Sequence, residues 1–205
     1  MSARPVLVID DEEAIRRSMQ LMLRVLGYEV QAFESGIAFL AAEAQLPRGC
    51  VLLDLRMPEI DGLEVQRRLR ANGADFSIVV MSGHGDLAVA VTAMEQGAVA
   101  YLEKPFSRVA LEQALELAFR RVENPGSYRE YLLSAAAALR NLEPIDRTVF
   151  ELIARGHDPE HIARQTGLTP PVIHESRARI YAELGVDTAT AALRLAFAAR
   201  RAAPH

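Results

Sequence analysis

The sequence has a single cysteine, no tryptophan and almost no lysine. Because Cys50 stands alone among 205 residues, a disulfide within the chain and a zinc site built from thiolates are both excluded. No uncharged apolar run approaches the roughly 20 residues that a membrane span needs, and residues 1–8 lack the apolar core of a signal peptide. We therefore expect a cytoplasmic protein without a membrane segment. Of the 23 basic residues only Lys104 is lysine, which suggests that its compact ammonium has a specific use.

Charge and turn-forming residues divide the chain into two parts. Residues 1–123 carry 18 acidic and 13 basic side chains, whereas residues 124–205 carry 9 and 10. The sequence Asn-Pro-Gly-Ser at 124–127 interrupts the helical pattern before it. Half of the chain is hydrophobic and 24 % is charged, which excludes a disordered protein. We predict a first domain at 1–123, a helical linker at 124–141 and a second domain at 142–205.

In the first domain, short apolar runs alternate with amphipathic segments. The apolar runs predict strands at 6–9, 29–33, 51–55, 77–81 and 100–102. The amphipathic segments predict helices at 12–26, 36–44, 63–71, 87–96 and 107–122. Five such units predict a doubly wound, five-stranded parallel sheet with helices on both faces. In sheets of this kind the functional site lies outside the carboxyl ends of the strands.

Charged and hydroxyl side chains occupy those strand ends. They are Asp10 and Asp11 after the first strand, Asp54 in the third, Ser82 after the fourth and Lys104 after the fifth. Each has a simple interpretation when taken alone, such as a helix cap for Asp11 or a turn residue for Ser82. Together they predict three carboxylates and one ammonium at one edge of the sheet. Carboxylates at close range raise one another's pKa unless a cation joins them.

The chemistry of this set favours Mg²⁺ and phosphoryl transfer. Ligands that offer only oxygen suit a hard cation, and Mg²⁺ is usually held by one or two carboxylates while it keeps several waters. An ion held by Asp11 and Asp54 leaves positions for phosphoryl oxygens, to which Lys104 adds a charge and Ser82 a hydroxyl donor. An aspartate can itself be the nucleophile and form an acyl phosphate.

Four segments resemble the signatures of a two-component receiver domain. They are Val-Ile-Asp10-Asp11-Glu, Leu-Asp54-Leu-Arg-Met-Pro-Glu-Ile-Asp-Gly, Met-Ser82-Gly-His-Gly-Asp and Ala-Tyr101-Leu-Glu-Lys104-Pro-Phe. The resemblance covers residues 5–122 and implies a flavodoxin-like fold.

The resemblance also implies a role for each site residue. Asp54 would accept a phosphoryl group from a phosphohistidine of a sensor histidine kinase. Asp11, Asp54 and the backbone carbonyl of Arg56 would bind Mg²⁺, with Asp10 acting mainly through a metal-bound water. Ser82 and Tyr101 would form the switch pair, in which the hydroxyl moves to the phosphoryl group and the ring follows inward.

The second domain is predicted to be a small all-α domain. Helices are expected at 144–155, from 159 to Gly167, at 170–184 and at 189–202, where Pro and Gly residues mark several of the ends. Ala163, Gly167 and Ile173 occupy the small, turn and apolar positions of a helix-turn-helix. This half resembles the LuxR/NarL-type DNA-binding domain, and the whole chain resembles a FixJ-type response regulator.

That resemblance implies that the helix at 170–184 enters the major groove of double-stranded DNA, and that the last helix forms a dimer contact. The candidate DNA contacts are Thr169, His174, Arg177 and Arg179. The recognition helix departs from the family pattern, because His174, Ser176, Arg179 and Glu183 stand where the family usually has Lys, His, Asn and Lys. Each lost cation weakens the attraction for DNA phosphates.

Three functions follow from these patterns. The first is a transcription regulator that is not an enzyme, is switched by phosphorylation of Asp54 and forms a homodimer when phosphorylated. The second is a receiver whose helical half binds a protein instead of DNA. The third is a metal-dependent phosphatase, which would turn over a phosphoester without a stable phospho-aspartate. The sequence does not choose between the helix-four/helix-five and helix-one/helix-five faces for the dimer.

Overall fold

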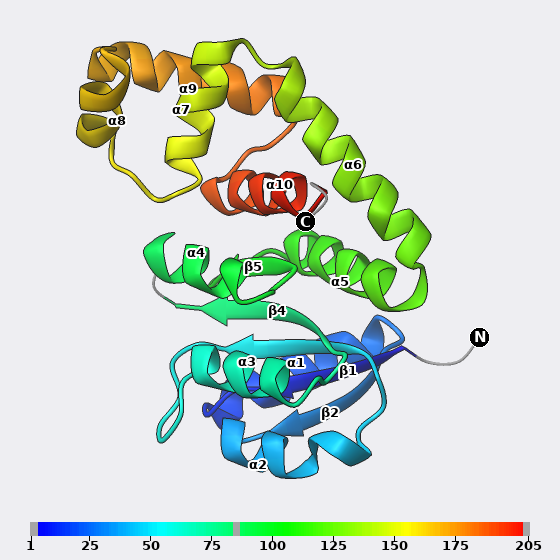
Figure 1. The fold of residues 1–205 in the computed structure, drawn as a ribbon. Coiled ribbons are helices and arrows are strands. Elements are labelled where there is room, and N and C mark those ends of the chain that lie inside the picture. The colour runs from blue at the N-terminus through cyan, green and yellow to red at the C-terminus, as the bar shows by residue number, and fades with distance from the viewer. Residues whose placement is uncertain (1–3, 84–86, 203–205) are drawn as a thin grey trace. The chain divides into compact units, whose positions relative to one another are not determined.

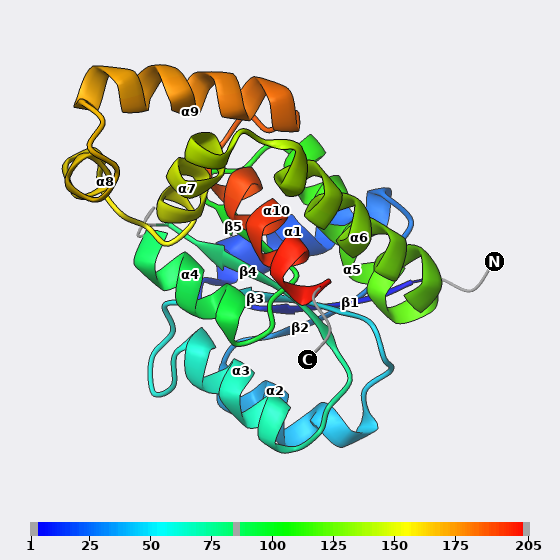
Figure 2. The same cartoon turned by 45° about the horizontal axis from the view of Figure 1, so that its top comes forward.

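The computed structural model describes residues 4–83 and 87–202 (Figures 1 and 2). The chain divides into two compact units, of which the first holds Met1–Gly85 with Thr92–Pro125 and the second holds Asp86–Val91 with Gly126–His205. The main division lies two residues after the predicted end of the first domain. The short segment Asp86–Val91, which the sequence places in the first domain, groups with the second unit.

The first unit contains a five-stranded parallel sheet in the order β2-β1-β3-β4-β5. The strands are β1 (Pro5–Ile9), β2 (Glu29–Phe33), β3 (Cys50–Asp54), β4 (Ser77–Ser82) and β5 (Ala100–Glu103). Nearly every residue of β1, β3 and β4 is buried, because helices cover both faces of the sheet. This burial explains why these strands appear in the sequence as unbroken apolar runs. The predicted doubly wound fold is confirmed.

Helices alternate with the strands in chain order. They are α1 (Glu13–Val25), α2 (Gly36–Ala42), α3 (Gly62–Ala71), α4 (Leu87–Glu95) and α5 (Arg108–Glu123), and a short 3₁₀ turn, Glu43–Gln45, follows α2. Right-handed crossovers place α1 and α5 on one face of the sheet and α2 and α3 on the other (Figures 1 and 2). On the first face, Tyr28 stacks on Phe119 of α5 with ring centroids 5.6 Å apart. On the second, Gln66 of α3 donates to the carbonyl of Ala93 in α4.

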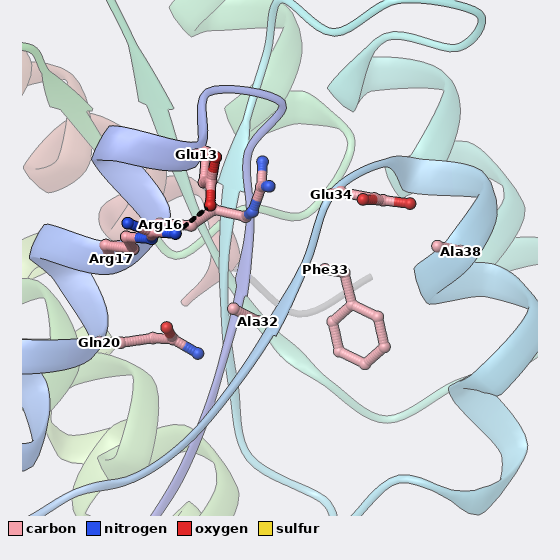
Figure 3. A pocket seen from close by; sticks show the side chains of 8 residues that line it. All are labelled: Glu13, Arg16, Arg17, Gln20, Ala32, Phe33, Glu34 and Ala38. Carbon is pink, nitrogen blue, oxygen red and sulfur yellow. Dashed lines mark hydrogen bonds and ion pairs between the residues drawn. The ribbon is translucent and has the colours of Figure 1, made fainter.

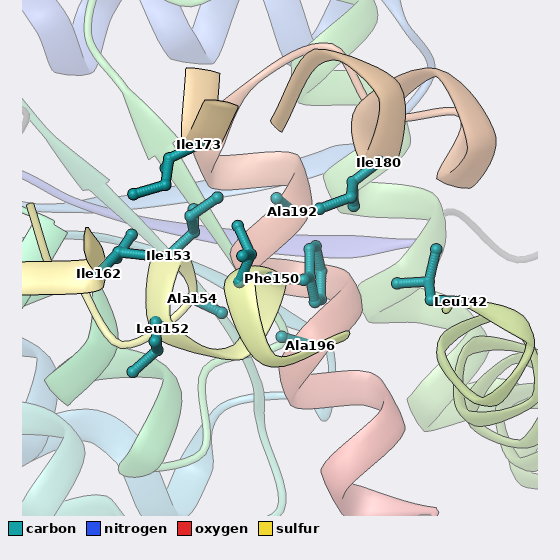
Figure 4. Close-up of a cluster of buried hydrophobic side chains, with 11 residues drawn as sticks. Leu142, Phe150, Leu152, Ile153, Ala154, Ile162, Ile173, Ile180, Ala192 and Ala196 are labelled. Atoms are coloured by element: carbon teal, nitrogen blue, oxygen red, sulfur yellow. The ribbon is translucent and has the colours of Figure 1, made fainter. Parts of the chain in front are cut away.

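The described part of the second unit consists of helices. The helix α6 (Pro125–Asn141) occupies the predicted linker, and α7 (Pro144–Ile153), α8 (Pro159–Thr166), α9 (Pro170–Leu184) and α10 (Ala189–Arg201) follow it. Arg147 of α7 donates to the carbonyl oxygens of Leu139, Arg140 and Leu142, and it thereby caps the end of α6. Side chains from α7, α8, α9 and α10 meet in one hydrophobic core around Phe150, which is fully buried (Figure 4).

Proline and glycine set the ends of these helices, as predicted. A proline stands in the first turn of α7, α8 and α9, and the Asp158 carboxylate accepts the His161 backbone N–H at the start of α8. Gly167 ends α8 with a φ of 73°, a left-handed conformation that favours glycine. Ile173, the predicted apolar position of the helix-turn-helix, is 2 % exposed in the core.

Candidate functional site

Four polar residues lie at the carboxyl edge of the sheet. Asp10, Asp54, Ser82 and Lys104 come together there because β1, β3, β4 and β5 are parallel and end close together in register. Asp10, Asp54 and Ser82 are 0 %, 6 % and 4 % exposed. The predicted edge site is therefore formed mainly by buried groups, whose charges need partners inside the protein.

Lys104 bridges two buried carboxylates. Its Nζ atom lies 2.6 Å from Asp10 Oδ2 and 2.6 Å from Asp54 Oδ1. The Lys104 side chain is 17 % exposed, and those of Asp10 and Asp54 are almost completely buried. A buried carboxylate without a cation is strongly destabilising, so the single lysine of the chain is placed where two such charges require it.

Burial and ion pairing shift the pKa values of Asp54 and Lys104. Burial raises the pKa of Asp54, and the hydrogen bond and charge of Lys104 oppose this rise without cancelling it. Burial alone would lower the pKa of Lys104, but the bonds to Asp10 and Asp54 outweigh that effect and leave the Lys104 pKa raised. Lys104 is therefore a stable cation at neutral pH, facing a carboxylate that takes up a proton more readily than an ordinary aspartate does.

Backbone groups hold the two carboxylates in place. The Arg56 N–H donates to Asp54 Oδ2 at 2.7 Å, and the Glu12 N–H donates to Asp10 Oδ1 at 3.0 Å. The simple interpretation of Asp11 as the cap of the first helix is wrong, because Glu12 is the N-cap residue of α1 and its side chain makes no capping bond. Asp10 takes the nearby Glu12 N–H instead.

Arg16 belongs to the site although no sequence motif points to it. Its Nη1 atom donates to the carbonyl oxygens of Asp10 and Asp11, both at 2.8 Å, and so ties the acidic loop to α1. Arg16 also lines a cavity of about 450 Å³ between α1, β2 and the start of α2, where the neighbouring Arg17 pairs with Glu13 (Figure 3). The sequence signal is a basic residue at the fourth position of the helix that follows an acidic pair.

The donor set fits a hard divalent cation. Asp10, Asp54 and backbone carbonyl groups offer oxygen alone, and Mg²⁺ requires only one or two carboxylates from a protein. Within residues 4–83 and 87–202, no three carboxylate, imidazole or thiolate side chains gather closely enough to hold an ion. Asp10 and Asp54 share the Lys104 ammonium, whereas Asp11 is exposed. Two of the three predicted carboxylates thus meet, and Lys104 lies between them.

The predicted switch pair lies on two neighbouring strands. Ser82 is the last residue of β4, and Tyr101 is in β5 opposite Val80. Tyr101 is only 4 % exposed, so its ring is already inside the protein. A coupled movement of the two side chains stays a prediction.

Comparisons with known proteins decide the family. The model of the response regulator receiver domain matches residues 6–116, which is more than half of the chain. Transcriptional regulatory protein FixJ of Bradyrhizobium diazoefficiens is 37 % identical over 194 residues, which cover 95 % of each chain. The chain belongs to the FixJ class of response regulators. Tetrathionate response regulatory protein TtrR of Salmonella typhimurium is 35 % identical over 84 % of this response regulator and 82 % of its own length.

Solved structures agree with this membership along the whole chain. Full-length FixJ from B. japonicum is 35 % identical and has a TM-score of 0.59, with 98 % of this chain and 99 % of that chain covered. The response regulator StyR is 30 % identical and has a TM-score of 0.56, covering 95 % and 98 %. Both the receiver half and the helical half therefore follow a class whose members regulate transcription under the control of phosphorylation. In the described part of the chain, no helix is long and apolar enough to cross a membrane.

The predicted DNA-contacting residues of this response regulator lie on or beside α9. Thr169 is the N-cap residue of that helix, although its side chain makes no capping bond. His174 and Arg177 are exposed, and Arg177 Nη2 lies 3.2 Å from His174 Nδ1. Arg179 differs from these residues because its guanidinium is paired with the buried Asp146 of α7.

Proposed function

We propose that Asp54 is the phosphoryl acceptor of this response regulator and that a sensor histidine kinase is the donor. The observation that carries this proposal is the buried Asp54 carboxylate, held at the carboxyl edge of the sheet by Lys104. A carboxylate oxygen of Asp54 forms a bond to phosphorus while the bond between phosphorus and the histidine nitrogen breaks. The nitrogen keeps the electron pair, and the product is an acyl phosphate on Asp54.

Receiver domains use Mg²⁺ at the phosphorylation site, and in this chain Asp11, Asp54 and the Arg56 carbonyl would hold it, with Asp10 acting through a water. The bound ion supplies charge neutralisation for the phosphoryl oxygens. Lys104 contributes a second cation, which can move from the Asp54 carboxylate to a phosphoryl oxygen. Ser82 contributes a hydroxyl donor at the end of β4. Arg16 keeps the Asp10–Asp11 loop in position through its two carbonyl contacts.

The output that we propose is binding to double-stranded DNA as a homodimer. Phosphorylation would shift an existing equilibrium towards the dimer, with Ser82 and Tyr101 as the switch pair. The α9 helix would enter the major groove and present His174 and Arg177, with Thr169 at its start. The residue ranges 1–123, 124–141 and 142–205 would serve as receiver, linker and DNA-binding domain.

We further propose that the protein acts as a regulator in the cytoplasm and not as an enzyme on outside substrates. Support comes from the FixJ-class relatives along the whole chain, and from the single, buried Cys50, which suits a reducing compartment. The protein-interaction alternative lacks comparable support, since FixJ is described as a transcriptional regulatory protein.

Labelling with a small phosphodonor tests the acceptor. The full chain incubated with labelled acetyl phosphate and Mg²⁺ should take up one label, which is lost on chelation of Mg²⁺ and in Asp54→Ala. Asp75→Ala is the matched control, because Asp75 is an exposed aspartate before β4 that pairs with Arg48. Equal labelling of Asp54→Ala and the wild type would overturn the proposal.

Selection of DNA from the organism's own genome tests the output. The phosphorylated full chain, mixed with sheared genomic DNA at low salt, should enrich a small set of fragments. Absence of any enrichment would remove DNA binding from the proposal and leave the receiver chemistry intact.

A further inference from the structure

Asp146 and Arg179 form a fork-shaped ion pair between α7 and α9. Arg179 Nη2 lies 2.7 Å from Asp146 Oδ1 and 2.8 Å from Oδ2, and Arg179 Nε lies 3.0 Å from Oδ2. The same Nη2 atom is 3.3 Å from the hydroxyl of Ser176, which is 3 % exposed. Both residues of the pair sit on helices that pack against each other.

The two partners differ in burial, and this difference shows which of them depends on the other. The Asp146 side chain is 3 % exposed, whereas the Arg179 side chain is 58 % exposed. Arg179 therefore closes over a carboxylate that has little access to water. A buried carboxylate is tolerated when it is paired and hydrogen-bonded, and it destabilises its surroundings when it is not.

The pair lies beside the apolar contact that seats α9. Ile173, Ser176 and Ile180 are the buried residues of α9, and Arg179 is adjacent to this face along the helix. The bond to Asp146 raises the pKa of Arg179, with the charges of Glu183 and Glu175 adding to the rise. The charge of Arg179 is thus already compensated within the protein, and a DNA phosphate would have to compete with Asp146 for it.

We propose that Arg179 is a positioning residue, which fixes the recognition helix α9 on α7 through Asp146 and does not contact DNA. This inference rests on the DNA binding proposed above, and it revises the sequence-based expectation that Arg179 contacts DNA. It leaves Arg177 and His174 as the exposed candidates on α9.

The discriminating variant is Asp146→Asn, because the two roles of Arg179 predict opposite results. If Arg179 positions α9, loss of the carboxylate weakens DNA binding by a factor similar to that caused by Arg179→Gln. If Arg179 contacts a phosphate, Asp146→Asn frees a cation and removes a negative charge, and binding becomes tighter. The ligand is the duplex fragment that the phosphorylated full chain enriches most from genomic DNA, and affinity is measured by fluorescence anisotropy.

The salt dependence of that affinity supplies a second readout, which a purely structural role does not change. Arg179→Gln should leave the negative slope of log affinity against log salt unchanged. A lost phosphate contact would make that slope less steep by about 0.9. Arg177→Gln is the matched control on the same helix, and it should make the slope less steep. Arg179→Lys keeps the charge but loses the fork, so it should bind more weakly than the wild type with an unchanged slope. Asp146→Glu keeps a carboxylate and should retain DNA binding.

A double-mutant cycle on Asp146 and Arg179 tests the ion pair between α7 and α9 without DNA. Urea unfolding of the wild type, the two single variants and the double variant should show coupling of at least about threefold in the unfolding equilibrium constant. Additive effects would overturn the proposal, as would tighter DNA binding by Asp146→Asn. If the wild type enriched no DNA while the coupling was present, the proposed DNA binding would fail and the anchoring contact would stand.

Discussion

Lys104 controls the charge balance of the receiver site. It lies 2.6 Å from one oxygen of Asp10 and one of Asp54, and both carboxylates are buried. Lys104 is the only lysine in the chain, and this singles out its position in the sequence. A planar guanidinium would present a broad fork instead of the compact charge that fits between two carboxylates.

Replacing Lys104 with methionine should destabilise the receiver by ~3 kcal/mol at neutral pH, because two buried carboxylates lose their cation. The folded-state pKa of Lys104 is raised above its ordinary value of 10.5, so its stabilising effect is fully present below that pH and is lost as pH rises through the folded-state pKa. In Lys104→Met the pKa of Asp54 should rise further, since the hydrogen bond and charge of Lys104 no longer oppose the effect of burial. The deficit should therefore shrink between pH 8 and pH 5 in urea unfolding, and an equal deficit at both pH values would contradict this account.

Arg16 supports the site through the backbone. Arg16→Gln should weaken Mg²⁺-dependent labelling by about tenfold, as expected when a residue that orients metal ligands is lost. Arg17→Gln is the matched control, because Arg17 is exposed and makes a surface ion pair with Glu13 that contributes little. Titration of Mg²⁺ at fixed acetyl phosphate measures the effect. Equal losses in the two variants would mean that the carbonyl contacts of Arg16 have no role in the site.

The start of α3 is packed against Asp54, the proposed phosphoryl acceptor. The Gly62 N–H donates to the Leu55 carbonyl, and a Cβ atom added at Gly62 would lie 2.4 Å from the Asp54 carbonyl oxygen. Only glycine allows the helix to approach this closely, so the position of Asp54 depends on a residue eight places later in the chain.

Gly62→Ala should therefore destabilise the receiver by ~1–3 kcal/mol and slow the labelling of Asp54, because the backbone of β3 must shift. Gly83→Ala is a suitable control for stability, since a Cβ atom there would meet no atom within 4 Å. Thermal unfolding and labelling rates measure both effects. Unchanged behaviour of Gly62→Ala would show that α3 can move away from Asp54 without cost.

Most element boundaries could be predicted because proline, glycine and apolar spacing act locally. For example, β2 was predicted at 29–33 and the strand is Glu29–Phe33, and Gly167 ends α8 as expected. The contacts that the sequence did not reveal join residues that no local pattern connects. Arg179 pairs with Asp146, 33 residues earlier, and Arg16 bonds to carbonyl oxygens, which every residue type possesses. Such contacts depend on the packing of whole helices.

The two units differ in charge and in their proposed roles. The first half carries 18 acidic and 13 basic residues, and its buried aspartates form the proposed phosphorylation site. The second half carries 9 acidic and 10 basic residues, and the Arg179–Asp146 pair compensates one of those cations. DNA affinity in this protein should therefore depend strongly on dimer formation, which doubles a modest number of phosphate contacts.

The division into two compact units predicts a separation of effects. Phe150→Ala removes the fully buried ring at the centre of the helical core and should cost the second unit about 3–5 kcal/mol. Labelling of Asp54 by acetyl phosphate should stay at the wild-type rate, while DNA binding is lost. A matching loss of labelling would show that the receiver depends on the helical unit for its own fold.

Control of DNA binding by phosphorylation is tested most directly by the DNA affinity of the full chain with and without phosphorylation of Asp54. Acetyl phosphate and Mg²⁺ should tighten binding of the wild type to its genomic fragment, whereas they should leave Asp54→Ala unchanged at the weaker affinity. Equal affinity of the wild type before and after phosphorylation, or the same tightening in Asp54→Ala, would contradict it.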